Sequence, residues 1–190
     1  GPIHPEPDQY AFRNADDIVD TAQAQGMRVR GHTLVWHRQL ARWIEDGEWT
    51  REALLDVLQQ HISTVVGRYR GRVYAWDVVN EAIDGRSLRE TVWLDAIGPE
   101  YLDLAFRWTH EADPDALLFY NDYGGEGLNL KSDAIYDLVA GMLERGVPVH
   151  GVGLQMHLVA GQAPPAGMAE NVARLTELGL EVHITELDVR

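Results

Sequence analysis

The stretch VYAWDVVNEA, residues 73–82, joins an apolar run to a polar end, because Asn80 and Glu81 directly follow the valines. A second stretch, EVHITELDV at residues 181–189, has the same form and carries Glu186 near its end. β-Branched and aromatic residues favour strands. Both stretches are therefore predicted to be strands that deliver a carboxylate at their C-terminal ends.

Outward from these two stretches, strand-like runs alternate with amphipathic, helix-like runs. The predicted strands lie near residues 28–36, 73–80, 117–122, 150–157 and 181–188, and the predicted helices lie near 14–25, 50–69, 100–112, 132–144 and 165–178. Regular alternation of this kind indicates parallel strands joined by helical crossovers. A generic doubly wound sheet is the competing interpretation, but no Gly-rich phosphate loop follows a strand.

Polar side chains stand at the C-terminal end of every predicted strand, where (β/α)₈ barrels place their chemistry. They are His32, Trp36, His37, Asn80, Glu81, Asn121, Asp122, Tyr123, Gln155, His157, Glu186 and Asp188. This distribution favours an α/β fold of the (β/α)₈ TIM-barrel type. A whole barrel needs eight strands and about 250 residues, so five strands in 190 residues predict an incomplete barrel.

No linker, repeat or low-complexity stretch divides the chain, and residues 1–190 are interpreted as one domain cut at both ends. The missing strands are expected to leave open sheet edges, which invite association. We therefore expect the isolated chain to be unstable or aggregated, and an intact domain to be monomeric.

Composition restricts the partners. The net charge of −14 disfavours nucleic acid and anionic membranes and is compatible with a neutral polysaccharide. There is no cysteine, no signal peptide and no apolar run long enough to span a membrane. Eight histidines raise the alternative of a metal hydrolase, but they form no HExxH motif or tight pair. No metal or cofactor is predicted.

Two carboxylates at one barrel mouth are what glycoside hydrolysis requires, one as an acid and one as a nucleophile or base. Period-two alternation puts Val182, Ile184 and Glu186 on one face of their strand. If the two aliphatic side chains point into the barrel, Glu186 points into its mouth. Asn80 and Glu81 are adjacent, so both reach one substrate only if their strand bends or bulges.

Five motifs in order resemble glycoside hydrolase family 10, the endo-β-1,4-xylanases, over nearly the whole chain. They are GHTLVWH (31–37), WDVVNEA (76–82), NDY (121–123), GLQMH (153–157) and ITELDV (184–189). The resemblance implies a barrel whose third to seventh strands are present here, and a secreted enzyme that hydrolyses xylan and xylo-oligosaccharides with retention.

The resemblance also implies a role for each matching residue. Glu81 corresponds to the acid/base and Glu186 to the nucleophile. Substrate-binding positions are His32, Trp36, Gln39, Asn80, Tyr123, Gln155 and His157, and His157 and Asp188 are expected to hold Glu186 ionised and oriented.

One departure from the family pattern is Gly124, which stands where an Asn usually follows the NDY motif. Segments that build the glycone side of the family's site lie outside both ends of this sequence. The alternatives left open are a carbohydrate-binding or inert fragment and a retaining β-glycanase of another specificity.

Overall fold

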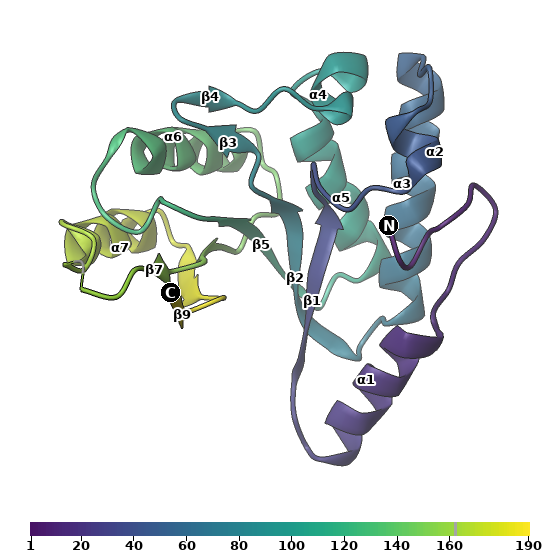
Figure 1. Ribbon diagram of the computed structural model, residues 1–190, viewed down its shortest axis with the longest axis horizontal. Helices are drawn as coiled ribbons and strands as arrows, with labels where there is room; N and C mark the ends of the chain where they lie inside the picture. The colour runs from purple at the N-terminus through teal and green to yellow at the C-terminus, as the bar shows by residue number, and fades with distance from the viewer. Residues whose placement is uncertain (162) are drawn as a thin grey trace.

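A computed structural model describes residues 1–161 and 163–190, with a five-stranded parallel sheet at its centre (Figure 1). The strands are β1 (Val29–Val35), β2 (Val73–Asn80), β5 (Leu117–Asp122), β6 (Gly151–Leu154) and β8 (Glu181–Ile184). They lie side by side in chain order, and every neighbouring pair is parallel. The predicted partial barrel is confirmed in strand number, order and direction.

Helices cover the outer face of this sheet (Figure 1). They are α1 (Arg13–Ala24), α2 (Arg42–Glu45), α3 (Arg51–Arg68), α4 (Val92–Ile97), α5 (Tyr101–Ala112), α6 (Leu130–Glu144) and α7 (Met168–Glu177). α2 and α4 were not predicted, because four and six residues are too few to show a helical period. No helix among the described residues is both long and apolar enough to cross a membrane.

Helix α3 forms where the sequence predicted it, because its start and its buried stripe are both encoded locally. The Thr50 side chain accepts a hydrogen bond from the Ala53 amide at 3.2 Å, which caps the first turn. The buried residues of the stripe are Leu54, Leu58, Ile62, Val65 and Val66. They pack in the same cluster as Leu118, Tyr120, Val152 and Leu154 of the sheet.

Helix α6 begins two residues earlier than predicted, because Asn129 caps it. The Asn129 side chain accepts from the amides of Lys131 and Ser132, and the Ser132 hydroxyl accepts from the Asn129 amide. This reciprocal pair satisfies amides that would otherwise lack partners in the first turn.

The inner face of the sheet is polar and aromatic. Arg30 of β1 donates to both carboxylate oxygens of Asp77 on β2 and lies 3.0 Å from His183 Nδ1 on β8. The His183 ring lies 4.4 Å from the ring of Phe119 on β5. Side chains from four strands therefore meet inside the arc.

This arrangement corrects the predicted orientation of β8. His183, rather than Val182 and Ile184, points to the inner face; Val182 packs against the hydrophobic core and Ile184 is 45% exposed. The interpretation was wrong because strand alternation defines two faces but does not say which of them is the inner one. Glu186 lies in the bend that follows β8, since β8 ends at Ile184.

Both C-terminal strands are shorter than predicted. β6 ends at Leu154, and the chain then turns through Met156, whose φ is +62°, before β7 (His157–Leu158). After β8 the chain forms β9 (Asp188–Val189), which pairs in parallel with β7. The two breaks carry Gln155 and Glu186 out of the strand path. A short hairpin, β3 (Ile83–Asp84) with β4 (Ser87–Leu88), was also not predicted.

Candidate active site

Glu81 lies directly after β2 in a left-handed backbone conformation, with φ of +57°. A non-glycine residue rarely adopts this conformation, and where it does the surroundings must hold it. The Glu81 amide donates to the Asn121 carbonyl at 2.9 Å. This turn, together with a register irregularity between Asp77 and Val79, is the predicted bend that lets Asn80 and Glu81 face the same site.

The Glu81 carboxylate is mostly buried, with 12% of its side chain exposed. Its Oε2 accepts from Trp36 Nε1 at 3.0 Å, and its Oε1 accepts from Gln155 Nε2 at 3.0 Å. Burial alone raises the pKa of Glu81, but the hydrogen bonds from Gln155 and Trp36 outweigh it and leave the pKa below the ordinary value. These surroundings therefore favour the ionised form of Glu81.

Glu186 lies in the bend between β8 and β9, with 31% of its side chain exposed. Asn121 Nδ2 donates to its Oε1 at 2.8 Å, and its amide donates to the Gln155 carbonyl at 3.1 Å. His157 Nε2 lies 3.5 Å from its Oε2. The carboxylate is thus held from β5 and from the β6–β7 turn.

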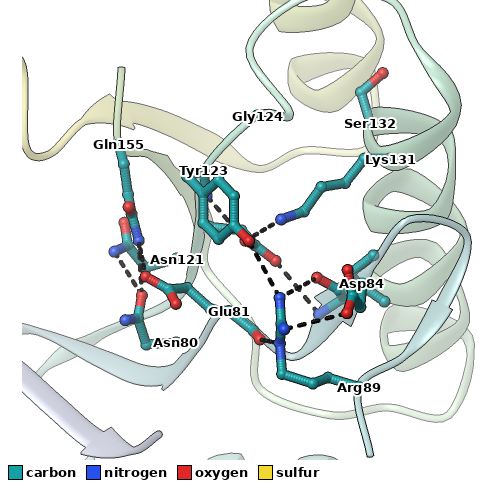
Figure 2. Close-up of polar contacts among 12 residues, drawn as sticks. Asn80, Glu81, Asp84, Arg89, Asn121, Tyr123, Gly124, Lys131, Ser132 and Gln155 are labelled. Carbon is teal, nitrogen blue, oxygen red and sulfur yellow. Dashed lines mark hydrogen bonds and ion pairs between the residues drawn. The ribbon is translucent and has the colours of Figure 1, made fainter. Parts of the chain in front are cut away.

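Three buried amides connect the two carboxylates, and Figure 2 shows these amides beside Glu81. Asn80 Oδ1 lies 2.9 Å from Asn121 Nδ2 and 3.1 Å from Gln155 Nε2. Asn121 then bonds Glu186, and Gln155 bonds Glu81. With its amide turned over, Asn80 would accept from Trp36 Nε1 at 3.2 Å and donate to the Asn121 carbonyl. The bonds from the Asn121 and Gln155 side chains belong to the first orientation, in which the Asn80 oxygen faces their NH₂ groups.

His157 lies between Gln155 and Asp188. Its Nδ1 is 2.8 Å from Asp188 Oδ1, and its Nε2 is 2.9 Å from Gln155 Oε1. Hydrogen bonds from His157 and Arg190 lower the pKa of Asp188. The structure therefore places His157 beside Glu186 and Asp188 beside His157, and the expected role of the pair in holding Glu186 ionised and oriented stays a prediction.

His32 lies on the Glu186 side. Its Nδ1 is 3.0 Å from Asp77 and 4.0 Å from Glu186 Oε1. Burial lowers the His32 pKa, but the Asp77 carboxylate and the Glu186 charge outweigh burial and raise it. The imidazole therefore gains a proton more readily than an isolated histidine does.

Trp36 and Gln39 lie in different surroundings. Trp36 points its indole N–H at Glu81, so its edge supports that carboxylate. Gln39 is exposed and has a φ of +54°. Gln39, His32 and Trp36 line a cavity of about 440 Å³ that extends to residues 1–4 and to α3.

Tyr123 lies at the other end of the site and is 38% exposed. Arg89 Nη2 donates to its hydroxyl at 3.2 Å, and Lys131 Nζ lies 3.5 Å from its ring centroid (Figure 2). Lys131 also pairs with the buried Asp122 at 2.8 Å. At Gly124, φ is +69° and an added Cβ would meet only the Lys131 side chain, at 3.8 Å. A side chain at position 124 would therefore find space limited only by Lys131.

Arg89 and Lys131 were not predicted as site residues, and Asn121 was named only as a polar residue at a strand end, without a role. A role for Asn121 could have been found, because it lies next to the last residue of β5 and is the register partner of Asn80, which ends the neighbouring β2. Gly153 also makes room for it, since an added Cβ there would lie 2.2 Å from Asn121 Oδ1. Arg89 and Lys131 come from loop and helix segments whose sequence gives no sign of the site.

The arrangement provides two carboxylates held by one amide network, with one carboxylate more buried than the other. Unlike surroundings are what an acid and a nucleophile need in order to act as a pair.

The chain is similar to known proteins over nearly its whole length. Residues 1–190 match the family described as Glycosyl hydrolase family 10. The chain is 47% identical over 187 residues to Endo-1,4-beta-xylanase B of Thermotoga neapolitana, covering 98% of this chain and 54% of that protein. It is 47% identical over 190 residues to Beta-1,4-xylanase of Dictyoglomus thermophilum, covering 98% of this chain and 53% of that protein.

Solved structures give the same result. Xylanase 10B from Thermotoga petrophila RKU-1, crystallised in complex with xylobiose, superposes with a TM-score of 0.96 at 52% identity, covering 98% of this chain and 57% of that one. Native xylanase 10B from Thermotoga maritima gives 0.96 at 51% identity, covering 98% and 58%. The chain thus spans about half the length of the curated relatives it matches.

Proposed function

Since the chain belongs to glycosyl hydrolase family 10, we propose that it carries the catalytic carboxylates of a retaining endo-1,4-β-xylanase, with Glu186 as nucleophile and Glu81 as acid/base. The observation that carries the proposal is the amide network: Asn80, Asn121 and Gln155 hold both carboxylates from the ends of three adjacent strands. The substrate assignment is supported by the names of the relatives, which are endo-1,4-beta-xylanases.

In the first step, a Glu186 oxygen attacks the anomeric carbon while Glu81 gives its proton to the glycosidic oxygen. The C–O bond to the leaving sugar breaks, and a glycosyl ester forms on Glu186. In the second step, Glu81 takes a proton from water, the water oxygen bonds to the anomeric carbon, and Glu186 leaves as a carboxylate. Both carboxylates then return to their starting states.

The pKa of Glu81 poses a condition for this mechanism. Its neighbours hold it low in the unliganded chain, whereas the first step needs the protonated acid. A bound sugar excludes water and desolvates the carboxylate, which raises a carboxyl pKa. Protonation of Glu81 would then accompany substrate binding.

The remaining roles complete the proposal. His157 and Asp188 orient Glu186, and His32, whose Nδ1 lies 4.0 Å from Glu186 Oε1, contacts the glycone sugar. Asn80, Gln155, His157, Trp36 and Gln39 contact the glycone sugars, and Tyr123 contacts the leaving-group sugar. The substrate is xylan or a xylo-oligosaccharide. Export from the cell is proposed because polysaccharide lies outside it; comparing activity in culture medium and cell extract tests this part.

Hydrolysis of soluble xylan and xylotetraose by this chain tests the function. The expected result is release of xylo-oligosaccharides whose reducing ends first form as the β-anomer, observed by proton NMR during the reaction. First formation of the α-anomer would contradict retention. No hydrolysis by the wild-type chain, with the same chain folded by circular dichroism, would show that these residues alone are an inert fragment.

A further inference from the structure

Arg89 is the polar residue that connects Glu81 to Tyr123. It follows the β3–β4 hairpin, and its side chain is 17% exposed. Its Nε lies 3.2 Å from the Glu81 carbonyl oxygen, and its Nη2 lies 3.2 Å from the Tyr123 hydroxyl (Figure 2). One guanidinium therefore bonds the main chain of the proposed acid/base and the aromatic ring at the leaving-group end.

The contact with Glu81 is made where the backbone needs support. Glu81 is held in a left-handed conformation, and its amide already donates to the Asn121 carbonyl. Arg89 supplies a donor to the Glu81 carbonyl, so both backbone polar groups of the residue are bonded. Strained residues at functional sites persist only where such contacts hold them.

The contact with Tyr123 fixes the far end of the ring. Arg89 holds the hydroxyl, while Lys131 lies over the ring and is itself held by Asp122. Asp84 accepts from Arg89 Nη1 at 3.2 Å, and the Arg89 amide donates to the Ala82 carbonyl at 2.8 Å. The hairpin, the Glu81 turn and Tyr123 are thereby joined at one side chain.

We propose that Arg89 is a positioning residue that sets the distance between the Glu81 carboxyl and a sugar resting on Tyr123, so that the acid lies against the leaving oxygen. The proposal rests on the proposed xylanase function and deepens it. A planar guanidinium can bond two separate acceptors in fixed directions, whereas the lysine ammonium is a single charge on a flexible stem. The role should therefore not survive Arg89→Lys.

Leaving-group dependence tests this role. Xylotetraose needs protonation of a poor leaving group, whereas 2,4-dinitrophenyl β-xylobioside needs almost none. Misplacing the acid by about 1 Å can cost about a hundredfold, so Arg89→Lys should lower kcat/KM for xylotetraose by at least about tenfold. It should lower kcat/KM for the aryl glycoside much less. A fall by the same factor for both substrates would overturn the proposal, because partial misfolding has that effect.

Two further variants keep the test decisive. Tyr123→Phe removes only the hydroxyl that accepts from Arg89, and its effect should not add to that of Arg89→Lys. Independent, additive effects would count against a link between the two residues. Arg145→Lys is the matched control, because Arg145 holds a fork on Asp103 at 2.6 and 2.9 Å far from the site. It should leave both substrates unchanged.

Hydrogen exchange of the arginine Nε–H groups, followed by NMR, separates this inference from the function itself. The Arg89 Nε–H should exchange with water more slowly than that of Arg145, whose side chain is 53% exposed. Equal exchange would overturn the link. A wild-type chain that hydrolyses neither substrate would overturn the xylanase proposal, and the exchange comparison would still decide whether Arg89 holds Glu81.

Discussion

The two carboxylates of the site occupy unlike surroundings. Glu81 follows β2, which is paired on both sides, and its side chain is 12% exposed. Glu186 follows β8, which among the described residues pairs only with β6, and its side chain is 31% exposed. Near Glu186, Leu187 is 62% exposed. The Glu81 region is therefore held by packing and by the contacts around its left-handed backbone, whereas the Glu186 region depends on a few hydrogen bonds.

The two residues also differ in the hydrogen bonds that hold them. Glu81 has two side-chain donors, a bonded amide and a bonded carbonyl. Glu186 has one side-chain donor, Asn121, a bonded amide and a nearby histidine. Substitutions near Glu81 and near Glu186 should therefore have different effects. We make four predictions, in order of decreasing expected effect.

Loss of the nucleophile should have the largest effect. Glu186→Ala removes the atom that bonds to the anomeric carbon, so no glycosyl-enzyme forms. The loss of kcat should exceed the factor of about 10²–10⁴ that acid–base catalysis supplies. Mass spectrometry with a 2-fluoro-xylobioside trap should show a covalent adduct on the wild type and none on the variant, and azide should not restore retaining activity. An adduct on the variant would remove Glu186 from this role.

Glu81→Ala should have a large effect that depends on the substrate. Activity on xylotetraose should fall by about 10²–10⁴-fold, because a poor leaving group needs a proton. For 2,4-dinitrophenyl β-xylobioside, kcat/KM should change little, since that leaving group departs without one. Steady-state kinetics on the two substrates measure the difference. Equal losses would contradict the assignment of Glu81 as the acid.

Asn121→Ala should destabilise the fold, because Asn121 is fully buried and bonds three partners. These are Asn80, Glu186 and Thr185, the last through its hydroxyl at 2.7 Å. Leaving buried polar partners unsatisfied costs about 1–3 kcal/mol. Urea unfolding of the variant should show this loss, whereas Asn129→Gly, at the exposed cap of α6, should cost a few tenths. A free energy of unfolding equal to that of the wild type would show that the hydrogen bonds of Asn121 do not stabilise the fold.

Trp36→Phe should give the smallest effect, a shift in pKa. The variant keeps a ring but loses the N–H that donates to Glu81 at 3.0 Å, so the pKa of Glu81 should rise toward its ordinary value of 4.5. Carbon-13 NMR titration measures this shift directly. Trp49→Phe, which loses only a bond to the Ile44 carbonyl, is the control and should leave the Glu81 pKa unchanged.

The same variant has a defined effect on stability. A carboxyl whose pKa is lower in the folded than in the unfolded chain stabilises the fold at pH values above its unfolded pKa. That stability is lost as the pH falls through the folded pKa. The difference in stability between wild type and Trp36→Phe should therefore be present at pH 7 and shrink below pH 4.5. A difference that grows on acidification would reverse the assigned direction.

The sequence by itself determined the order of strands and helices, because apolar period and caps such as Thr50 act over a few residues. It also predicted that Glu81, Glu186, Gln155 and His157 lie at strand ends, where parallel strands meet. The family resemblance assigned their roles, and those assignments stay predictions.

Only the tertiary structure decided the details of the site. The left-handed turn at Glu81, the inner position of His183 and the bridging place of Asn121 depend on contacts between residues 40 or more positions apart. The link from Arg89 to Tyr123 spans 34 positions. Local propensity and alternation carry no information over such separations. The predicted orientation of β8 was wrong because strand alternation defines two faces, whereas contacts with the rest of the barrel determine which face points inward.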